Sequence, residues 1–150
     1  MNETLIADRL RTDLTAALRA KDELRKTTIR AMMTAIKNAE VSGTEAHTLA
    51  EDEVQALVRS EVKKRLDTAQ IYADAGRPEQ AQRERDEAGV LESYLPAQLD
   101  ADELAAIVAA EVANAGDKPQ LGLVIKAVRA RVGQQASGGD IAAAVKSALG

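Results

Sequence analysis

Ser60 and Lys63 have the spacing of a serine nucleophile and the lysine that assists it. Serine acyl-enzymes carry this S-x-x-K motif together with S-D-N and K-T-G motifs elsewhere in the chain. Here the motif lies within a helical pattern, and neither companion motif occurs in the sequence. We interpret the spacing as coincidence and predict no catalytic residue.

The glycines between Gly133 and Gly139 are spaced like those of a phosphate-binding loop. Such a loop continues with Lys and then Ser or Thr, which contact phosphate and magnesium. This chain has Gly139-Asp140 at those positions, and no strand pattern precedes them. A nucleotide site is therefore not expected, whereas a tight turn with Ser137 capping the last helix is. Backbone N–H groups at that helix start could receive one phosphate of a larger partner.

Cysteine and histidine, which are the usual ligands of zinc, are scarce. The chain has no cysteine, and its one histidine, His47, is interpreted as an exposed loop residue. Acidic residues are plentiful, but their spacing is that of solvated helix faces and does not indicate paired catalytic acids. We expect no metal and no cofactor.

Basic residues are the better indication of function. The net charge of −4 argues against indiscriminate binding of nucleic acid, but local basic faces remain. Lys126 and Arg129 share a helix face, Arg131 borders the glycine turn, and with Lys146 they could form a phosphate-sized patch. A solvated face is the alternative. The candidate RNA-binding residues are Lys126, Arg129, Arg131, Ser137, Gly138 and Lys146.

A second basic surface is predicted in the first two thirds of the chain. Its residues are Arg25, Arg30, Lys37, Lys63 and Lys64. The C-terminal part has no aromatic residue, so base stacking is unavailable there, and any RNA would be recognised by backbone and shape.

The composition is that of a helical protein without disulfides. Of 150 residues, 45% are hydrophobic and 29% are charged, and no apolar run approaches the roughly 20 residues of a membrane-spanning helix. The absence of cysteine fits a reducing compartment. We expect a cytoplasmic protein with no membrane partner.

Four helices are predicted before Pro96. The four-residue spacing of Ile6, Leu10, Leu14 and Leu18 indicates a buried face on a first helix that begins near residues 2–4. The second helix follows an Asp22 cap and ends at residues 42–43.

The third and fourth helices also have clear boundary signals. A capping box at residues 48–51, with Thr48 as the cap, begins the third and longest helix, which ends at Gly76. The fourth helix begins at Pro78 and reaches Leu95, because Pro96 restricts the residue before it.

Three further helices are predicted after Pro96. Asp100 and Glu103 form a capping box at the start of the fifth helix, which stops at Gly116; a sixth runs from about 119 to 132; a seventh carries Ile141 and Val145. The expected fold is all-α, with an N-terminal helical domain of about four helices over 1–95 and a C-terminal three-helix domain over 96–150.

An ordered set of short motifs resembles the GatB/YqeY family, and in particular its free-standing YqeY-like members. The resemblance covers essentially the whole chain. It is carried by Lys21-Asp22, Ile29-Arg30, Ala35-Ile36-Lys37, Val62-Lys63-Lys64-Arg65, Ala75-Gly76-Arg77, Glu84, Glu87 and Tyr94-Leu95-Pro96-Ala97-Gln98-Leu99.

The resemblance implies kinship with the tail of the GatB subunit of the glutamine-dependent tRNA amidotransferase. In that carbon-nitrogen ligase the tail holds tRNA, while transamidation takes place in other domains. The implied function is a helical module, bacterial and cytoplasmic, that binds tRNA or another structured RNA without catalysis of its own; no DNA partner is expected. One alternative is a protein-interaction module that docks onto an amidotransferase or translation component. Another is a participant in amidotransferase activity, which the missing nucleophile and ATP motif disfavour.

The chain departs from the family pattern at two places. Relatives usually read Gly-Lys-Val-Met where this chain has Gly122-Leu123-Val124-Ile125, and Gly-Arg/Lys-Ala-Asp-Gly where it has Gln-Gln-Ala-Ser-Gly at 134–138. The small residues of the turn are retained, while two basic residues and one acid are lost.

Overall fold

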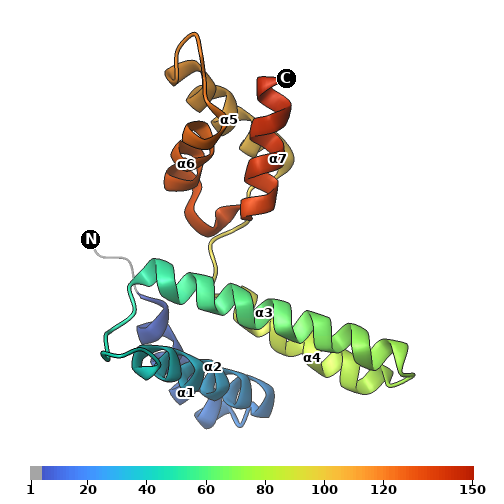
Figure 1. Cartoon of the computed structure of the whole chain (residues 1–150). Helices are drawn as coiled ribbons and strands as arrows, with labels where there is room; N and C mark the ends of the chain where they lie inside the picture. The colour runs from blue at the N-terminus through green and yellow to red at the C-terminus, as the bar shows by residue number, and fades with distance from the viewer. Residues whose placement is uncertain (1–4) are drawn as a thin grey trace. The chain divides into compact units, whose positions relative to one another are not determined.

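The computed structural model describes residues 5–150, and the chain is helical with no strand in that range (Figure 1). The predicted all-α class is confirmed. The predicted start of the first helix at residues 2–4 lies outside the described residues. The helices are α1 (Ile6–Ala20), α2 (Glu23–Val41), α3 (Glu51–Asp74), α4 (Pro78–Glu92), α5 (Ala101–Asn114), α6 (Leu121–Val132), the 3-10 helix η1 (Gly133–Gln135) and α7 (Gly138–Leu149).

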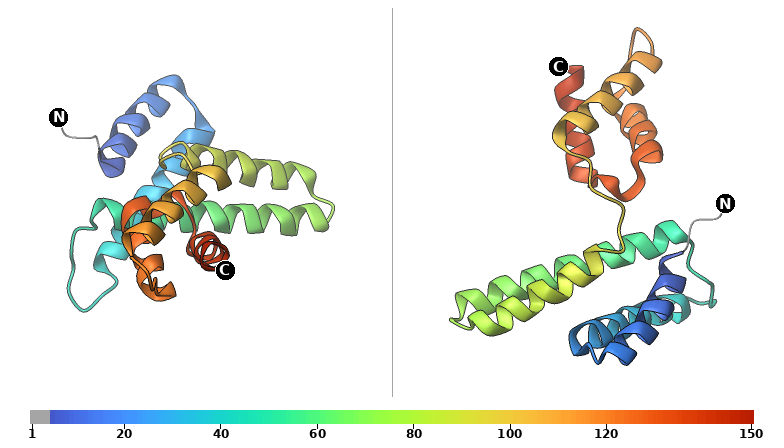
Figure 2. Two further views of the ribbon diagram at one scale, coloured as in Figure 1. Left: turned by 90° about the horizontal axis from the view of Figure 1, so that it is seen from above. Right: turned by 180° about the vertical axis from the view of Figure 1, so that it is seen from behind.

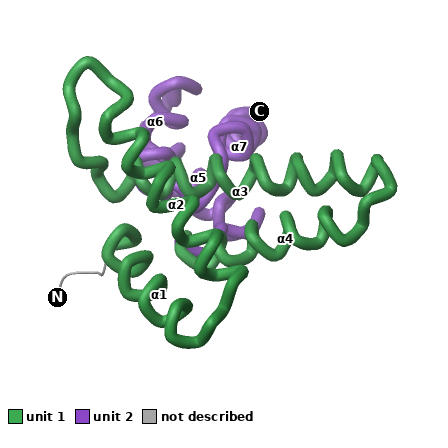
Figure 3. Tube along the Cα trace, turned by 90° about the horizontal axis from the view of Figure 1, so that it is seen from below, with its two compact units in different colours: residues 1–95 green, residues 96–150 purple. Residues whose placement is uncertain are grey.

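The chain divides into two compact units, residues 1–95 (unit 1) and residues 96–150 (unit 2) (Figure 3). In unit 1, α1 and α2 form one hairpin, and α3, which is the longest helix, lies side by side with α4 in a second hairpin (Figures 1 and 2). Each unit has its own hydrophobic core. The largest fully buried side chains of unit 1 belong to Leu10, Ile29, Met32, Val58 and Leu91.

Unit 2 packs α5, α6 and α7 around a core built mainly from valine and isoleucine. Its fully buried side chains belong to Val108, Val124, Val128, Ile141 and Val145. The segment that precedes α5 is bonded to η1, since Leu99 N donates to Gln135 O at 2.9 Å and Gln135 Nε2 donates to Ala97 O at 3.3 Å. Residues 97–99 therefore belong structurally to unit 2.

Three of the four predicted side-chain caps are confirmed. The Asp22 carboxylate accepts from Arg25 N at 3.1 Å, and the Ser137 hydroxyl accepts from Asp140 N at 3.1 Å. Asp100 and Glu103 form a reciprocal capping box, because Asp100 accepts from Glu103 N at 2.7 Å and Glu103 accepts from Asp100 N at 3.3 Å. These caps fix where α2, α5 and α7 begin.

The predicted Thr48 cap is wrong. Helix α3 begins at Glu51 after Ala50, and it is the Glu53 carboxylate that accepts from Ala50 N at 3.1 Å. Glu51 instead accepts from Ile6 N at 3.2 Å. The start of α3 is thus capped locally by Glu53 and is also bonded to a segment far away in the sequence.

Two helix boundaries and one buried position also differ from prediction. Helix α4 ends at Glu92 rather than Leu95, because the Ser93 hydroxyl bonds to Val90 O at 2.6 Å and the chain tightens into a turn. Helix α6 begins at Leu121 rather than near 119, since Gln120 is extended. Leu18 is 45% exposed and Ala17 is buried in its place. Each step of four residues moves a side chain about 40° around the helix axis. The three steps from Ile6 to Leu18 therefore place Leu18 about 120° away from Ile6.

Tyr94 anchors the end of unit 1 to α1. Its side chain is only 3% exposed, and its hydroxyl donates a hydrogen bond to the Asp13 carboxylate. The Arg9 guanidinium lies 4.7 Å from the ring centroid and donates to the carbonyl oxygen of Ser93 at 3.3 Å. Burial is the main cause that raises the pKa of Tyr94, and the hydrogen bond to Asp13 and the charge of Asp13 raise it further.

This environment predicts alkaline sensitivity of unit 1. A free tyrosine ionises near pH 10, whereas folded Tyr94 stays protonated to higher pH, so its contribution is complete below about pH 10 and is lost as pH rises through the folded pKa. Tyr94→Phe should lower the free energy of unfolding at neutral pH by about 1–2 kcal/mol and should reduce its fall above pH 10. Urea denaturation at several pH values measures both effects. Tyr72→Phe is the control, and an equal reduction in that variant would contradict the assignment to Tyr94.

Candidate nucleic-acid interface

Arg129 lies over the first residue of α7. A Cβ built on Gly138 would overlap Nη2 of the Arg129 guanidinium, so the arginine occupies the space that any larger residue would need. At the same point, helix geometry leaves the N–H groups of Gly138 and Gly139 without intrahelical acceptors. A guanidinium and the positive end of a helix dipole therefore occur together, and both favour an anion.

Lys126 extends this cationic surface along α6. It lies one helical turn before Arg129 on the same face, and both side chains are exposed. Within residues 5–150, no carboxylate lies within ion-pair distance of either cation. The nearest acid in sequence to the helix start is Asp140, in the first turn of α7. We call Lys126, Arg129, Ser137 and Gly138 the α6–α7 surface.

The other two predicted RNA-binding residues lie elsewhere in unit 2. Arg131 is rotated by about 200° from Arg129 around α6. It forms an ion pair with Glu111 of α5 at 3.5 Å. Lys146 is exposed in the last turn of α7, about 12 Å along the helix axis from Gly138. Arg131 is thus not brought together with the α6–α7 surface.

The second predicted basic surface is largely neutralised. Lys63 pairs with Asp67 at 3.0 Å, and Lys64 pairs with Glu61 at 3.4 Å. Arg25 lies 3.9 Å from Asp13. Only Arg30 and Lys37 of this set are exposed without an ion pair inside the described range. They do not form a broad field that would favour a polyanion.

The sequence did not predict that charged side chains of α3 and α4 would form one partly buried cluster. Arg65 pairs with Glu61 at 3.1 Å, as its spacing predicts, and also approaches Glu87 of α4 at 3.7 Å. Burial is the main cause that raises the pKa of Glu84, and the negative charge of Glu87 raises it further. Arg83 of α4 also approaches Glu87, at 3.9 Å. These contacts join the two helices, and no cluster suited to a metal occurs over residues 5–150.

The comparisons with known proteins connect unit 1 and unit 2 to one family. Three curated yeast relatives are each named altered inheritance of mitochondria protein 41, mitochondrial. The protein of Lachancea thermotolerans is 34% identical over 86 residues, which cover 57% of this chain and 46% of the relative. The protein of Meyerozyma guilliermondii is 34% identical with shares of 57% and 44%, and that of Clavispora lusitaniae is 35% identical with shares of 57% and 49%.

The match spans less than half the length of these relatives. In the part of the chain that the structure describes, no helix is both long and apolar enough to cross a lipid bilayer.

A family profile described as Yqey-like protein matches residues 7–149. The expected resemblance is thereby confirmed, and the chain belongs to the YqeY-like family.

Proposed function

We propose that the chain is a non-catalytic helical module that binds tRNA or another structured RNA through the α6–α7 surface. The observation that carries the proposal is the position of the Arg129 guanidinium over Gly138, at the helix start where N–H groups are free to bond. A phosphate placed there would accept charge-assisted hydrogen bonds from the guanidinium and bonds from backbone N–H groups. Lys126 would contact a neighbouring phosphate.

The side chains of unit 2 indicate which kind of RNA it would bind. Residues 96–150 contain no aromatic side chain, so recognition would depend on the backbone and shape of a folded RNA. The resemblance to the amidotransferase tail makes tRNA the first ligand to test. The proposal places the protein in the cytoplasm, whereas the names of the yeast relatives place those proteins in mitochondria.

Gly138→Ala and Gly139→Ala form a matched pair that tests this site. The methyl group introduced by Gly138→Ala would take the position of Arg129 Nη2 and displace a flexible side-chain end, while a Cβ at Gly139 meets nothing within 4 Å. We expect Gly138→Ala to weaken binding of bulk tRNA several-fold at low salt and Gly139→Ala to leave it unchanged. Both variants should unfold within about 1 kcal/mol of the parent, because alanine suits the first helical turn.

Fluorescence anisotropy with labelled tRNA measures these affinities. Equal affinities of the two variants would contradict the role of Arg129 at Gly138. Failure of the parent protein to bind tRNA at low salt would contradict RNA binding as a whole.

One observation favours the alternative, a module that docks onto an amidotransferase or translation protein. Leu123, where relatives usually have lysine, is 62% exposed beside a hollow of about 300 Å³ that is lined by Ala115, Val124 and Ala127 among others. Under this alternative, Leu123→Lys should abolish co-elution with the purified amidotransferase after nuclease treatment. Under RNA binding, the same change should raise the affinity for tRNA, because it adds a cation.

A further inference from the structure

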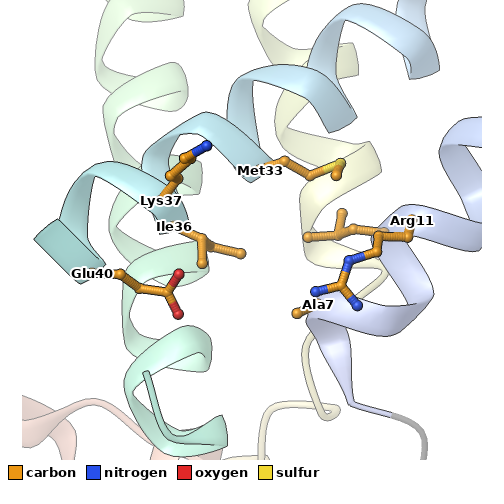
Figure 4. A pocket seen from close by; sticks show the side chains of 7 residues that line it. Ala7, Arg11, Met33, Ile36, Lys37 and Glu40 are labelled. Atoms are coloured by element: carbon orange, nitrogen blue, oxygen red, sulfur yellow. The ribbon is translucent and has the colours of Figure 1, made fainter. Parts of the chain in front are cut away.

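Unit 1 has a groove between α1 and α2 that the proposed function does not use. Its volume is about 340 Å³, and its apolar lining is provided by Leu10 of α1 and by Met33 and Ile36 of α2. The charged residues Arg11, Lys37 and Glu40 also line it. In Figure 4, the Arg11 guanidinium and the Glu40 carboxylate enter from opposite sides, with Ile36 between the two helices.

The groove continues along α2 toward the loop that follows it. A second hollow of about 280 Å³ shares Lys37 and Glu40 with the first and is also lined by Val41 and His47. From Met33 to Val41, the two hollows follow about 12 Å of helix, which is more than two turns. Val41 is 59% exposed. We call the two hollows together the α2 groove, and its length suits an elongated ligand.

The charged residues of the α2 groove indicate the sign of the charge that the ligand should carry. Arg11 is paired with Asp8 at 2.6 Å, and Glu40 accepts a hydrogen bond from Leu49 N at 3.0 Å. His47 lies 3.6 Å from Glu53. Lys37, which belongs to both hollows, is exposed and has no carboxylate within ion-pair distance among the residues that the structure describes. The Glu40 carboxylate keeps its negative charge, and Lys37 is the lining cation that remains for an acid of the partner.

We propose that the α2 groove binds an amphipathic helical segment of another protein, about two to three turns long, that carries an acidic residue opposite Lys37. Helices dock into grooves of this kind by placing apolar side chains on the apolar lining and charged side chains at its edges. The partly exposed Ala7 and Met33 receive the apolar side chains of the partner, next to the buried Leu10 and Ile36. Lys37 pairs with its acid and fixes its register.

Two labelled peptides of about 15 residues test the proposal with the full-length protein. Both form an amphipathic helix with leucines on one face; the first has a single glutamate beside that face, and the second has lysine at the same position. We expect the glutamate peptide to bind more tightly. Lys37→Glu should weaken the glutamate peptide roughly fivefold and strengthen the lysine peptide, because one exposed attraction becomes a repulsion.

Arg85→Glu is the matched control. It makes the same change in charge on an exposed position of α4 that does not line the groove. The affinity of both peptides should be unchanged. A second variant, Met33→Lys, should weaken both peptides, since it places a charge in the apolar lining; circular dichroism checks that it remains helical.

The outcomes separate the proposal from weaker explanations. Fluorescence anisotropy that shows no binding of either peptide would overturn it. Equal affinities for the two peptides, or equal effects of Lys37→Glu and Arg85→Glu, would also overturn it, because the binding would then not depend on a charge in the α2 groove.

Discussion

Changing Lys126 and Arg129 together to alanine is expected to lower the affinity for tRNA at low salt by about ten- to a hundredfold. The two cations share one face of α6 and are without ion pairs over residues 5–150, so their charge is available to phosphate. Each phosphate contact contributes nearly one unit to the slope of log affinity against log salt concentration. That slope should therefore become shallower by about two units in the double variant.

Arg131→Ala is the matched control for that experiment. It removes the same kind of charge from the same helix, but Arg131 is already paired with Glu111 on the side of α6 that faces α5. We expect less than about a threefold loss of affinity. Anisotropy titrations over a series of salt concentrations measure both variants. A double variant with an unchanged salt slope, or an Arg131→Ala variant that loses as much affinity, would contradict the assignment of the α6–α7 surface.

Local signals in the sequence were sufficient for most helix boundaries. Asp22, Asp100 and Ser137 each cap a helix whose bonded N–H group lies only three residues away, so the capping contact can be inferred without tertiary structure. The positive φ of 74° at Gly76 likewise follows from its place after α3. These positions were predicted because the interaction and its signal lie in the same few residues.

Predictions that depended on tertiary contacts failed or were incomplete. The start of α3 is accompanied by the bond from Ile6 N to Glu51 at 3.2 Å, which joins segments 45 residues apart, and by the bond from Leu49 N to Glu40 at 3.0 Å, which spans the loop between α2 and α3. Nothing near Thr48 in the sequence indicates either bond. The opposite directions of Arg129 and Arg131 follow from helical geometry, but their partners on α7 and α5 do not. The α2 groove could not be predicted, because it depends on how closely α1 approaches α2.

Leu91→Ala should have the largest effect on stability of the substitutions considered for unit 1. Leu91 is 0% exposed and packs in the same core as Leu10, Ile29 and Tyr94. Leucine-to-alanine changes at such positions cost about 2–5 kcal/mol, because the removed methyl groups leave a cavity. Alanine is an even better helix former than leucine, so the loss cannot be assigned to helix propensity.

Unit 1 can be followed selectively in that experiment. The chain has no Phe or Trp, and both of its tyrosines, Tyr72 and Tyr94, lie in unit 1, so tyrosine fluorescence reports the unfolding of that unit. Leu66→Ala is the control, since Leu66 is 43% exposed, and it should cost less than about 1 kcal/mol. Natural domains are stable by only about 5–15 kcal/mol, so the loss at Leu91 would be a large share of the total. Similar urea midpoints for the two variants would mean that α4 is not held by the core that Leu91 completes.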